Sequence, residues 1–216
     1  MKRELSYDLR ECSLEVVNAL CVAHHGYGAA SATATYCFAV YEDKKPVAAY
    51  AWQPPPYGAA KSVCPEAPAS VLALSRMAAV ERSVRRLNHI SKPLRRQMNR
   101  LIDRGRWPVL VTYHDEGQGH TGHVYKCSGW TLTKPGELRA FYVNAKGNRA
   151  SRYSNGKTGG RSLAKGGQTR IHRWEHWVCE RGEAARWMTD HGWRRVPILG
   201  KVWKSGNQAY AWKKAS

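Results

Sequence analysis

The segment from Trp107 to Trp130 constrains the fold of this chain more than any other stretch. It opens with apolar and β-branched residues at 109–113, which have the length and composition of a buried strand. Five polar side chains follow within residues 114–120, and a short helix carrying Tyr125 then ends at Gly129. Polar side chains between a buried strand and a helix are held by two rigid elements, so this segment predicts a functional site.

Two blocks of the sequence hold nearly all of the formal net charge of +19. Residues 76–106 contain ten Lys or Arg and two acids, and residues 139–173 contain nine and none, which leaves +2 elsewhere. Charge kept for solubility alone would mix both signs, so these blocks predict a polyanionic partner, with nucleic acid as the first candidate. An acidic membrane surface is the weaker alternative, because neither block forms a basic amphipathic helix with a bulky apolar side.

Length and composition narrow the class of protein. A chain of 216 residues is expected to form one domain with a sizeable core. The sequence has no run of 18 apolar residues and no apolar signal-peptide core at its start, which predicts a cytoplasmic protein with no membrane partner. The six cysteines have no CxxC spacing, so we expect reduced and mostly buried thiols rather than a zinc cluster.

Periodicity predicts the elements of the N-terminal part. Apolar spacing within residues 1–23 indicates an amphipathic helix that ends at the HHGYG loop, 24–28. That loop could approach a ligand closely, but taken alone it is better explained as an ordinary helix end. Strands at 36–41 and 47–52 flank the turn at 42–46 and predict a hairpin.

The central part continues with a loop, a strand and a basic helix. Residues 53–68, which include three consecutive prolines, predict an irregular loop. A third strand covers 71–77, and a helix that Gly105 closes covers 78–106. Arg76 at the end of a buried strand is costly unless it pairs with a structural carboxylate or faces a ligand, and both interpretations remain open.

The sequence changes character after Trp130. Residues 144–170 are rich in Gly, Lys and Arg and predict a mobile loop or hairpin. A helix at 183–191 and short strands at 196–202 and 210–212 follow. The expected organisation is a catalytic core at 1–138, a basic Gly-rich loop or hairpin at 139–173, and a C-terminal helix and strands at 174–216 that complete the same domain.

Four segments carry a resemblance to a known family: HHGYG at 24–28, YCFAVY at 36–41, LSRM at 74–77 and TYHDEGQGHTGHVYKCSGW at 112–130. Their order and content resemble the Mom family of phage DNA-modification proteins, a branch of the GNAT acyltransferase fold. Members of that family convert adenine in phage DNA to N6-carbamoylmethyl-adenine, which protects the DNA from restriction enzymes. The resemblance therefore implies a DNA-modifying enzyme in the cytoplasm of the host cell.

The resemblance covers roughly residues 10–135 and implies an α/β (α+β) fold. Its features would be a mixed, largely antiparallel central sheet, helices on both faces and, in this chain, a basic C-terminal extension. In GNAT proteins the strand that corresponds to 71–77 splays from the one that corresponds to 109–113, and the cofactor lies in the gap. Carried over residue by residue, the family's functional positions fall on His25 or Tyr27, Arg76, Asp115 and Tyr125, with His24 as an alternative to His25. We expect Asp115, Tyr125, Arg76 and Tyr27 to be catalytic, and His24, His25, Ser75, Tyr113 and His114 to contact the substrate.

The implied chemistry gives each catalytic residue a role. The adenine N6 amine is a poor nucleophile inside the duplex, so the base must first be flipped out. Asp115 would accept a hydrogen bond from the amine or take its proton, Tyr125 would protonate the leaving group, and Arg76 would bind an anionic part of the donor. The alternatives are structural: Asp115 as a helix N-cap and Tyr125 as a core aromatic with a satisfied hydroxyl.

The donor and any cofactor are not disclosed by the sequence. GNAT enzymes hold the coenzyme A pyrophosphate on a Gly-rich loop after the splayed strand, but residues 77–88 contain no glycine, which argues against a standard coenzyme A thioester site. Iron(II) is a minority alternative, in which Asp115 and two imidazoles form a facial triad. The imidazoles available for it are His24, His25, His114, His120 and His123.

The expected partner is double-stranded or locally opened DNA, held through its phosphates by the basic blocks. Two other functions remain: a coenzyme A-dependent N-acetyltransferase of the GNAT superfamily, which the missing glycines oppose, and a non-catalytic nucleic-acid-binding protein, which the polar cluster opposes. The residues expected to contact DNA are Arg85, Arg86, Arg95, Arg96, Arg100, Arg149, Arg152, Lys157, Arg161 and Lys165.

Overall fold

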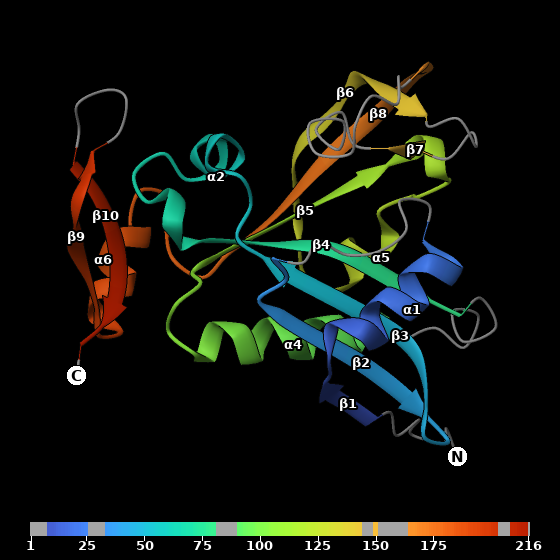
Figure 1. Cartoon of the computed structure of the whole chain (residues 1–216), viewed down its shortest axis with the longest axis horizontal. Helices are drawn as coiled ribbons and strands as arrows, with labels where there is room; N and C mark the ends of the chain where they lie inside the picture. The colour runs from blue at the N-terminus through green and yellow to red at the C-terminus, as the bar shows by residue number, and fades with distance from the viewer. Residues whose placement is uncertain are drawn as a thin grey trace.

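The computed structural model describes residues 8–25, 33–80, 90–143, 149–150, 164–202 and 208–215. Within them, eight strands form one sheet in the order β1-β2-β3-β4-β5-β8-β6-β7, and two more form a separate sheet, β10-β9 (Figure 1). Every pairing is antiparallel except that of β4 with β5. This arrangement confirms the predicted mixed, largely antiparallel sheet. No helix in the described ranges is long and apolar enough to cross a membrane.

The N-terminal elements differ from the prediction at their start. The first helix is shorter than expected, because a short strand precedes it and pairs with the edge of the sheet. That strand buries only Leu9, so it has no apolar pattern that sequence reasoning could detect. The hairpin is confirmed, and its turn is Asp43-Lys44 with φ of 48° and 63°, as in a tight two-residue hairpin turn. The elements are β1 (Asp8–Glu11), α1 (Leu14–His24), β2 (Tyr36–Glu42) and β3 (Lys45–Gln53).

Two predictions for the central part are wrong. The expected loop at 53–68 contains a helix, which forms because Ala60 and Val63 pack against the sheet. The expected helix at 78–106 begins later, since residues 78–79 still belong to the third strand and residues 81–89 lie outside the described ranges. The elements are α2 (Tyr57–Val63), the 3-10 helix η1 (Pro68–Ser70), β4 (Val71–Ala79) and α4 (Ser91–Asp103).

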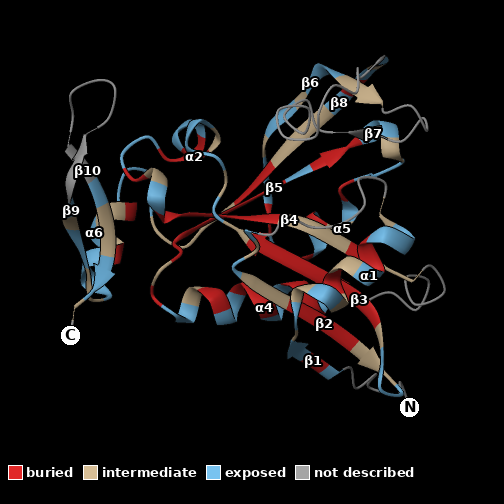
Figure 2. Ribbon diagram, in the orientation of Figure 1, coloured by how far each residue is buried: buried red, intermediate tan, exposed pale blue. Residues whose placement is uncertain are grey.

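Helices cover both faces of the sheet, as expected (Figure 2). On one face, α4 buries Leu94, Met98 and Leu101 against large side chains such as Trp52. On the other face, α1 packs against small side chains of β3 and β4, including Ala51, which let the helix approach closely. Gly105, with φ of +68°, follows the end of α4 as predicted.

The two parallel strands separate beyond their first four residues. β4 pairs with β5 (Val109–Asp115) only from Val71–Val109 to Leu74–Thr112, and each strand then continues without the other. At the same point the pairing of β4 with β3 shifts register, which makes Ser75 an extra residue in β4. Such a bulge re-aims the side chains that follow it. The result is a gap in the sheet between the C-terminal halves of the two parallel strands.

The described parts of the basic C-terminal extension are strands. β6 (Thr131–Val143) pairs with β8 (Ala164–Trp177), and β8 lies between β5 and β6, so the sequence from 131 to 177 doubles back on itself. β7 (Arg149–Ala150) pairs with the end of β6. The helix α6 follows, and the last two strands pair only with each other rather than extending the main sheet (Figure 1). These elements are α6 (Ala184–Asp190), β9 (Trp193–Val202) and β10 (Gln208–Lys214).

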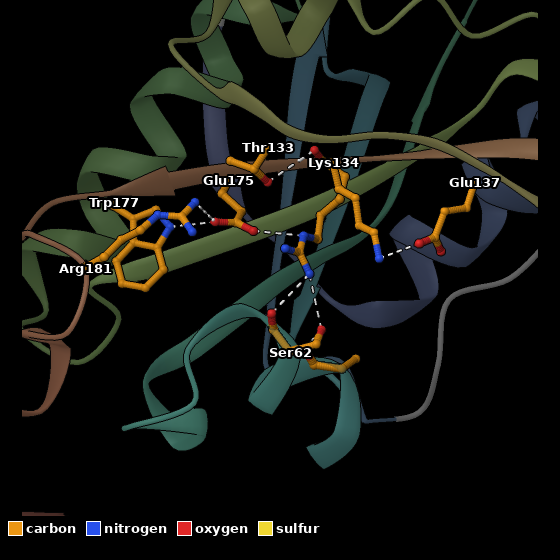
Figure 3. A network of polar contacts seen from close by, with 9 residues as sticks. Ser62, Thr133, Lys134, Glu137, Glu175, Trp177 and Arg181 are labelled. Carbon is orange, nitrogen blue, oxygen red and sulfur yellow. Dashed lines mark hydrogen bonds and ion pairs between the residues drawn. The ribbon is translucent and has the colours of Figure 1, made fainter.

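A network around the buried carboxylate of Glu175 connects β8 to α2. Glu175 is 1% exposed and accepts hydrogen bonds from Trp177 Nε1 at 2.7 Å and Arg181 at 2.8 Å (Figure 3). Its other oxygen lies 2.8 Å from Arg173 Nε, an ion pair whose angle departs from that of a hydrogen bond. Arg173 also donates to the Ser62 carbonyl and hydroxyl, so the network ties β8 to α2. A buried charge is tolerated only when it is paired in this way.

Candidate functional site

A cavity of about 420 Å³ opens in the gap between β4 and β5. Its volume lies within the range of about 300–1,000 Å³ that is usual for small-molecule sites. The two splayed strands, the end of α1, the start of α4, the segment before α5 (His123–Cys127) and α5 itself build it. The polar side chains that line it are His25, Ser75, Arg76, Ser91, Thr112, Tyr113, His120, Thr121, His123, Tyr125 and Cys127.

Tyr125 presents a protonated hydroxyl at this cavity. Its ring is 7% exposed and packs among the large apolar side chains that α4 covers. Burial raises the pKa of its hydroxyl, and a hydrogen bond with Thr112 acts in the opposite direction. The Thr112 hydroxyl donates to the carbonyl of Leu74 at 3.2 Å, across the last pair of the parallel ladder. Tyr125 therefore stays a phenol at neutral pH and can give a proton to a group in the cavity.

Arg76 and His25 lie at the α1 side of the cavity. The Arg76 guanidinium is half-buried and donates from one terminal nitrogen to the carbonyl of Ser75 at 2.7 Å. Burial lowers the pKa of His25 to about 4, with the positive charges of Arg76 and His120 acting in the same direction. His25 is consequently a neutral imidazole at pH 7. The sequence prediction brought Arg76, His25 and Tyr125 to one site, and all three line this cavity.

His114 is buried behind Tyr125 rather than in the cavity wall. Trp174 donates from Nε1 to His114 Nδ1 at 2.7 Å, which fixes the tautomer with its proton on Nε2. His172 stacks on it with ring centroids 4.4 Å apart and an interplanar angle of 4°. Burial lowers the pKa of His114, and the neighbouring His172 and His120 lower it further. His114 is therefore a neutral support for Tyr125, whose ring centroid lies 6.4 Å away.

Asp115 does not converge with Arg76 and Tyr125 on the cavity, so this part of the prediction is wrong. Side chains alternate along a strand, so Asp115 leaves β5 on the face opposite to His114. There it is 4% exposed and caps the 3-10 helix η2 (Glu116–Gln118), accepting from the Gly117 N–H at 2.9 Å and from the Thr169 hydroxyl. The capping alternative holds, although the capped helix is η2 rather than α5.

The remaining predicted positions divide into three groups. His24 is exposed next to His25 but does not line the cavity, whereas Ser75 and Tyr113 do. Arg95 and Arg100 donate to the main-chain carbonyls of Ser128 and Leu9, so at least part of their role is structural, while Arg96 and Lys165 are exposed. The predicted positions outside the described residues are Tyr27, Arg85, Arg86, Arg152, Lys157 and Arg161, and only the backbone of Arg149 is described.

Metal and cofactor chemistry can be compared with the side chains present. Among the described residues, no three His, Cys, Asp or Glu side chains are grouped so that they could hold a metal ion. The proposed iron(II) triad fails on geometry, because Asp115 is used as a cap and His114 Nδ1 accepts from Trp174. The glycine-free segment after Arg76 lies partly in residues 81–89, outside the described ranges.

Sequence reasoning missed several residues of the site. Cys127 lines the cavity with its thiol 3.2 Å from Nε2 of His123, which sequence reasoning considered as a metal ligand. The spacing of four between the two residues on a helix could have indicated this pair. Thr112, read as part of a buried strand, supports Tyr125. Trp174 and His172 lie far along the chain, and no local signal connects them with His114. They meet it only because β8 inserts next to β5.

Comparison with known families decides the relationship of this chain. The sequence model of the Mom protein family matches residues 6–214, almost the whole sequence. The chain belongs to the Mom protein family. A search of curated proteins gives no match. The segments at 24–28, 36–41, 74–77 and 112–130 that resembled the Mom family thus indicated the correct relationship, and the match extends through the C-terminal part as well.

Solved structures similar to this Mom family member are acetyltransferases of low sequence identity. The ribosomal-protein-S18-alanine N-acetyltransferase from Escherichia coli has a TM-score of 0.50 at 10% identity, covering 82% of this chain and 98% of its own. The IAA acetyltransferase from Bacillus cereus has a TM-score of 0.50 at 10% identity, covering 80% of this chain and 100% of its own. A GNAT-family acetyltransferase from Streptococcus pneumoniae has a TM-score of 0.50 at 10% identity, covering 81% of this chain and 100% of its own. At this identity the likeness establishes a GNAT-like fold.

Proposed function

We propose that this protein is a group-transferring enzyme that modifies the N6 amine of adenine in DNA, in the manner of a carbamoylmethylation. The observation that carries the proposal is the protonated Tyr125 hydroxyl at a cavity between the splayed strands of a GNAT-like sheet. Membership of the Mom family supports adenine as the substrate class. The charge supports DNA as the polymer that carries it, because residues 139–173 hold nine Lys or Arg and no acid. The product would protect DNA against restriction.

The cavity supports a transfer in which each side chain has one task. The N6 nitrogen attacks the carbon of the donor, a bond from nitrogen to carbon forms, and the bond from that carbon to the leaving group breaks. Tyr125 gives its proton to the leaving group, and the Thr112 hydroxyl turns from the Leu74 carbonyl to donate to the resulting phenolate. The neutral imidazole of His25 accepts the proton that the amine loses, and Arg76 holds an anionic part of the donor.

The cavity volume of about 420 Å³ supports entry of a single flipped base together with a small donor. A base inside a duplex cannot reach Tyr125, since the hydroxyl lies among buried side chains. Flipping costs roughly a few kcal/mol, which the phosphate contacts must offset. Binding should accordingly weaken steeply as salt rises.

The test is to express the protein in cells and analyse the nucleosides of their DNA by mass spectrometry. The proposal expects an adenine derivative heavier by one transferred group, its loss in Tyr125→Phe, and its retention in Tyr210→Phe, which removes a hydroxyl from β10. Acetylated small amines with unchanged DNA would instead favour a coenzyme A-dependent acetyltransferase. Unchanged DNA that is nevertheless bound in a salt-sensitive way would favour a binding protein without activity.

A further inference from the structure

The pair of strands β6 and β8 continues past the end of β5. β8 pairs with β5 only over residues 171–177, whereas its pairing with β6 continues to Ala164 opposite Val143. Beyond β5 the two strands form a ribbon of about seven residues per strand, roughly 20 Å long at about 3.3 Å per residue (Figure 1). It is two-stranded except at its far end, where β7 pairs with Tyr142 and Val143. Leu138 on this ribbon is 58% exposed. A single exposed leucine is common on protein surfaces, so the charge of the ribbon rather than Leu138 carries the argument that follows.

The two faces of the ribbon differ in charge. Cross-strand partners project to the same face, so the pairs Leu138–Arg170, Ala140–Gln168 and Tyr142–Lys165 define one face. We call this set of six residues the ribbon face; it contains two cations and no acid. The opposite face carries Arg139, which pairs with Glu137 at 3.2 Å. Glu137 lies at the base of the ribbon, opposite Ile171, and also pairs with Lys134 at 2.5 Å, so the positive charge on this side is largely compensated.

The ribbon face is continuous with the catalytic side of the sheet. Arg170 is two residues from His172, which stacks on His114, and His114 neighbours Tyr125. Gly136 brings the backbone of β6 close to this row, since its N–H donates to His172 Nδ1 and its carbonyl accepts from Arg170. Among the described residues, this basic surface leads toward the residue proposed to do the chemistry and passes Glu116, whose carboxylate lies 2.6 Å from His172 Nε2.

We propose that the ribbon face binds the DNA duplex flanking the target adenine, with Arg170 and Lys165 on phosphates and Gln168 facing a groove. This inference rests on the proposed function and names the surface that holds its substrate. A two-stranded ribbon fits the major groove, which is about 12 Å wide, and amide side chains can pair with adenine edges there. Leu138 and Tyr142 supply apolar contact beside the phosphates.

The test compares two variants with equal loss of charge on opposite faces of one ribbon. Arg170→Gln/Lys165→Gln removes the cations of the ribbon face, and Arg139→Gln/Lys134→Gln removes those of the other face. Binding of an adenine-containing DNA duplex is measured at several salt concentrations, with circular dichroism to verify folding. The ribbon-face variant should reduce the slope of log affinity against log salt by roughly 2, because each phosphate contact contributes about 0.9. The other variant should change the slope much less.

Each other result has a defined meaning. Equal effects of both variants would overturn the assignment to one face, and unchanged binding in both would overturn the ribbon as a DNA contact. Equal affinity for an RNA duplex, with the same dependence on Arg170 and Lys165, would overturn the assignment to DNA. Adenine modification by the unaltered protein is measured in parallel. If modification occurs while the ribbon variants bind normally, only this inference fails; if none occurs, the proposed function fails.

Discussion

Trp174 Nε1 donates a hydrogen bond to His114 Nδ1 at 2.7 Å, and this contact sets the protonation state of the imidazole behind Tyr125. A hydrogen bond to the neutral form of a base disfavours its charged form. Trp174→Phe, which keeps most of the ring packing, should therefore raise the pKa of His114. Titration of the His114 ring by NMR measures this, with Trp193→Phe in β9 as a control. An unchanged or lower His114 pKa in Trp174→Phe would contradict the assigned tautomer.

Gly122 is expected to be intolerant of a side chain, for two separable reasons. It has φ of +70°, and an added Cβ would lie 2.6 Å from the Trp174 ring and 2.9 Å from the His114 ring. Gly119 has nearly the same φ, +72°, but nothing lies within 4 Å of its Cβ position. Gly119→Ala should cost about 1–2 kcal/mol of unfolding free energy through backbone strain, and Gly122→Ala about 1–3 kcal/mol more through overpacking. Equal losses in chemical denaturation would show that the contact is absent.

His25 should make stability depend on pH in the acid range. Its pKa is about 4 in the folded protein and 6.5 for an unperturbed imidazole, as in the unfolded chain. Between these pH values the unfolded chain therefore binds more protons than the folded protein. The contribution of neutral His25 is fully present above about pH 6.5 and is lost as the pH falls toward 4. His25→Gln should flatten the unfolding free energy between pH 6.5 and 4, and His24→Gln, at the exposed neighbour, should not. A similar slope in both variants would refute the depressed pKa.

Asp115 and Thr169 should be energetically coupled. The Thr169 hydroxyl and the Gly117 N–H both donate to the buried Asp115 carboxylate. Asp115→Ala should cost about 1–3 kcal/mol by leaving buried donors unsatisfied, and Thr169→Ala should cost less when Asp115 is already replaced. A double-mutant cycle of unfolding free energies measures this coupling. Strict additivity would mean that the two side chains act independently.

The Glu175 network should respond unequally to the loss of its two arginines. The Arg173 side chain is 15% exposed and that of Arg181 is 60% exposed. Arg173→Met leaves the buried carboxylate without its inner partner and should cost about 3–5 kcal/mol, whereas Arg181→Met should cost about 0–1 kcal/mol because water can replace the lost charge. Thermal unfolding of the two variants compares them directly. A greater loss for Arg181→Met would contradict the burial assigned to this pair.

The sequence predicted those parts of the site that depend on local pattern. The strand carrying Arg76 and the helix carrying Tyr125 were predictable because an apolar run marks the strand and glycines bound the helix. Asp115 was misplaced because a one-residue step along β5 reverses the face, and the family resemblance does not specify where the carboxylate points. The contact of His114 with Trp174 was not predictable, since it depends on β8 entering the sheet beside β5, sixty residues later in the chain.

The most direct test of the account is the nucleoside composition of DNA exposed to this protein. DNA from cells that express the unaltered chain, Tyr125→Phe or Tyr210→Phe is digested and analysed by mass spectrometry, with each protein verified as folded. The account predicts an adenine derivative modified at N6 with the unaltered chain and with Tyr210→Phe, and unmodified adenine with Tyr125→Phe. Unmodified adenine in all three samples, or full modification by Tyr125→Phe, would contradict it.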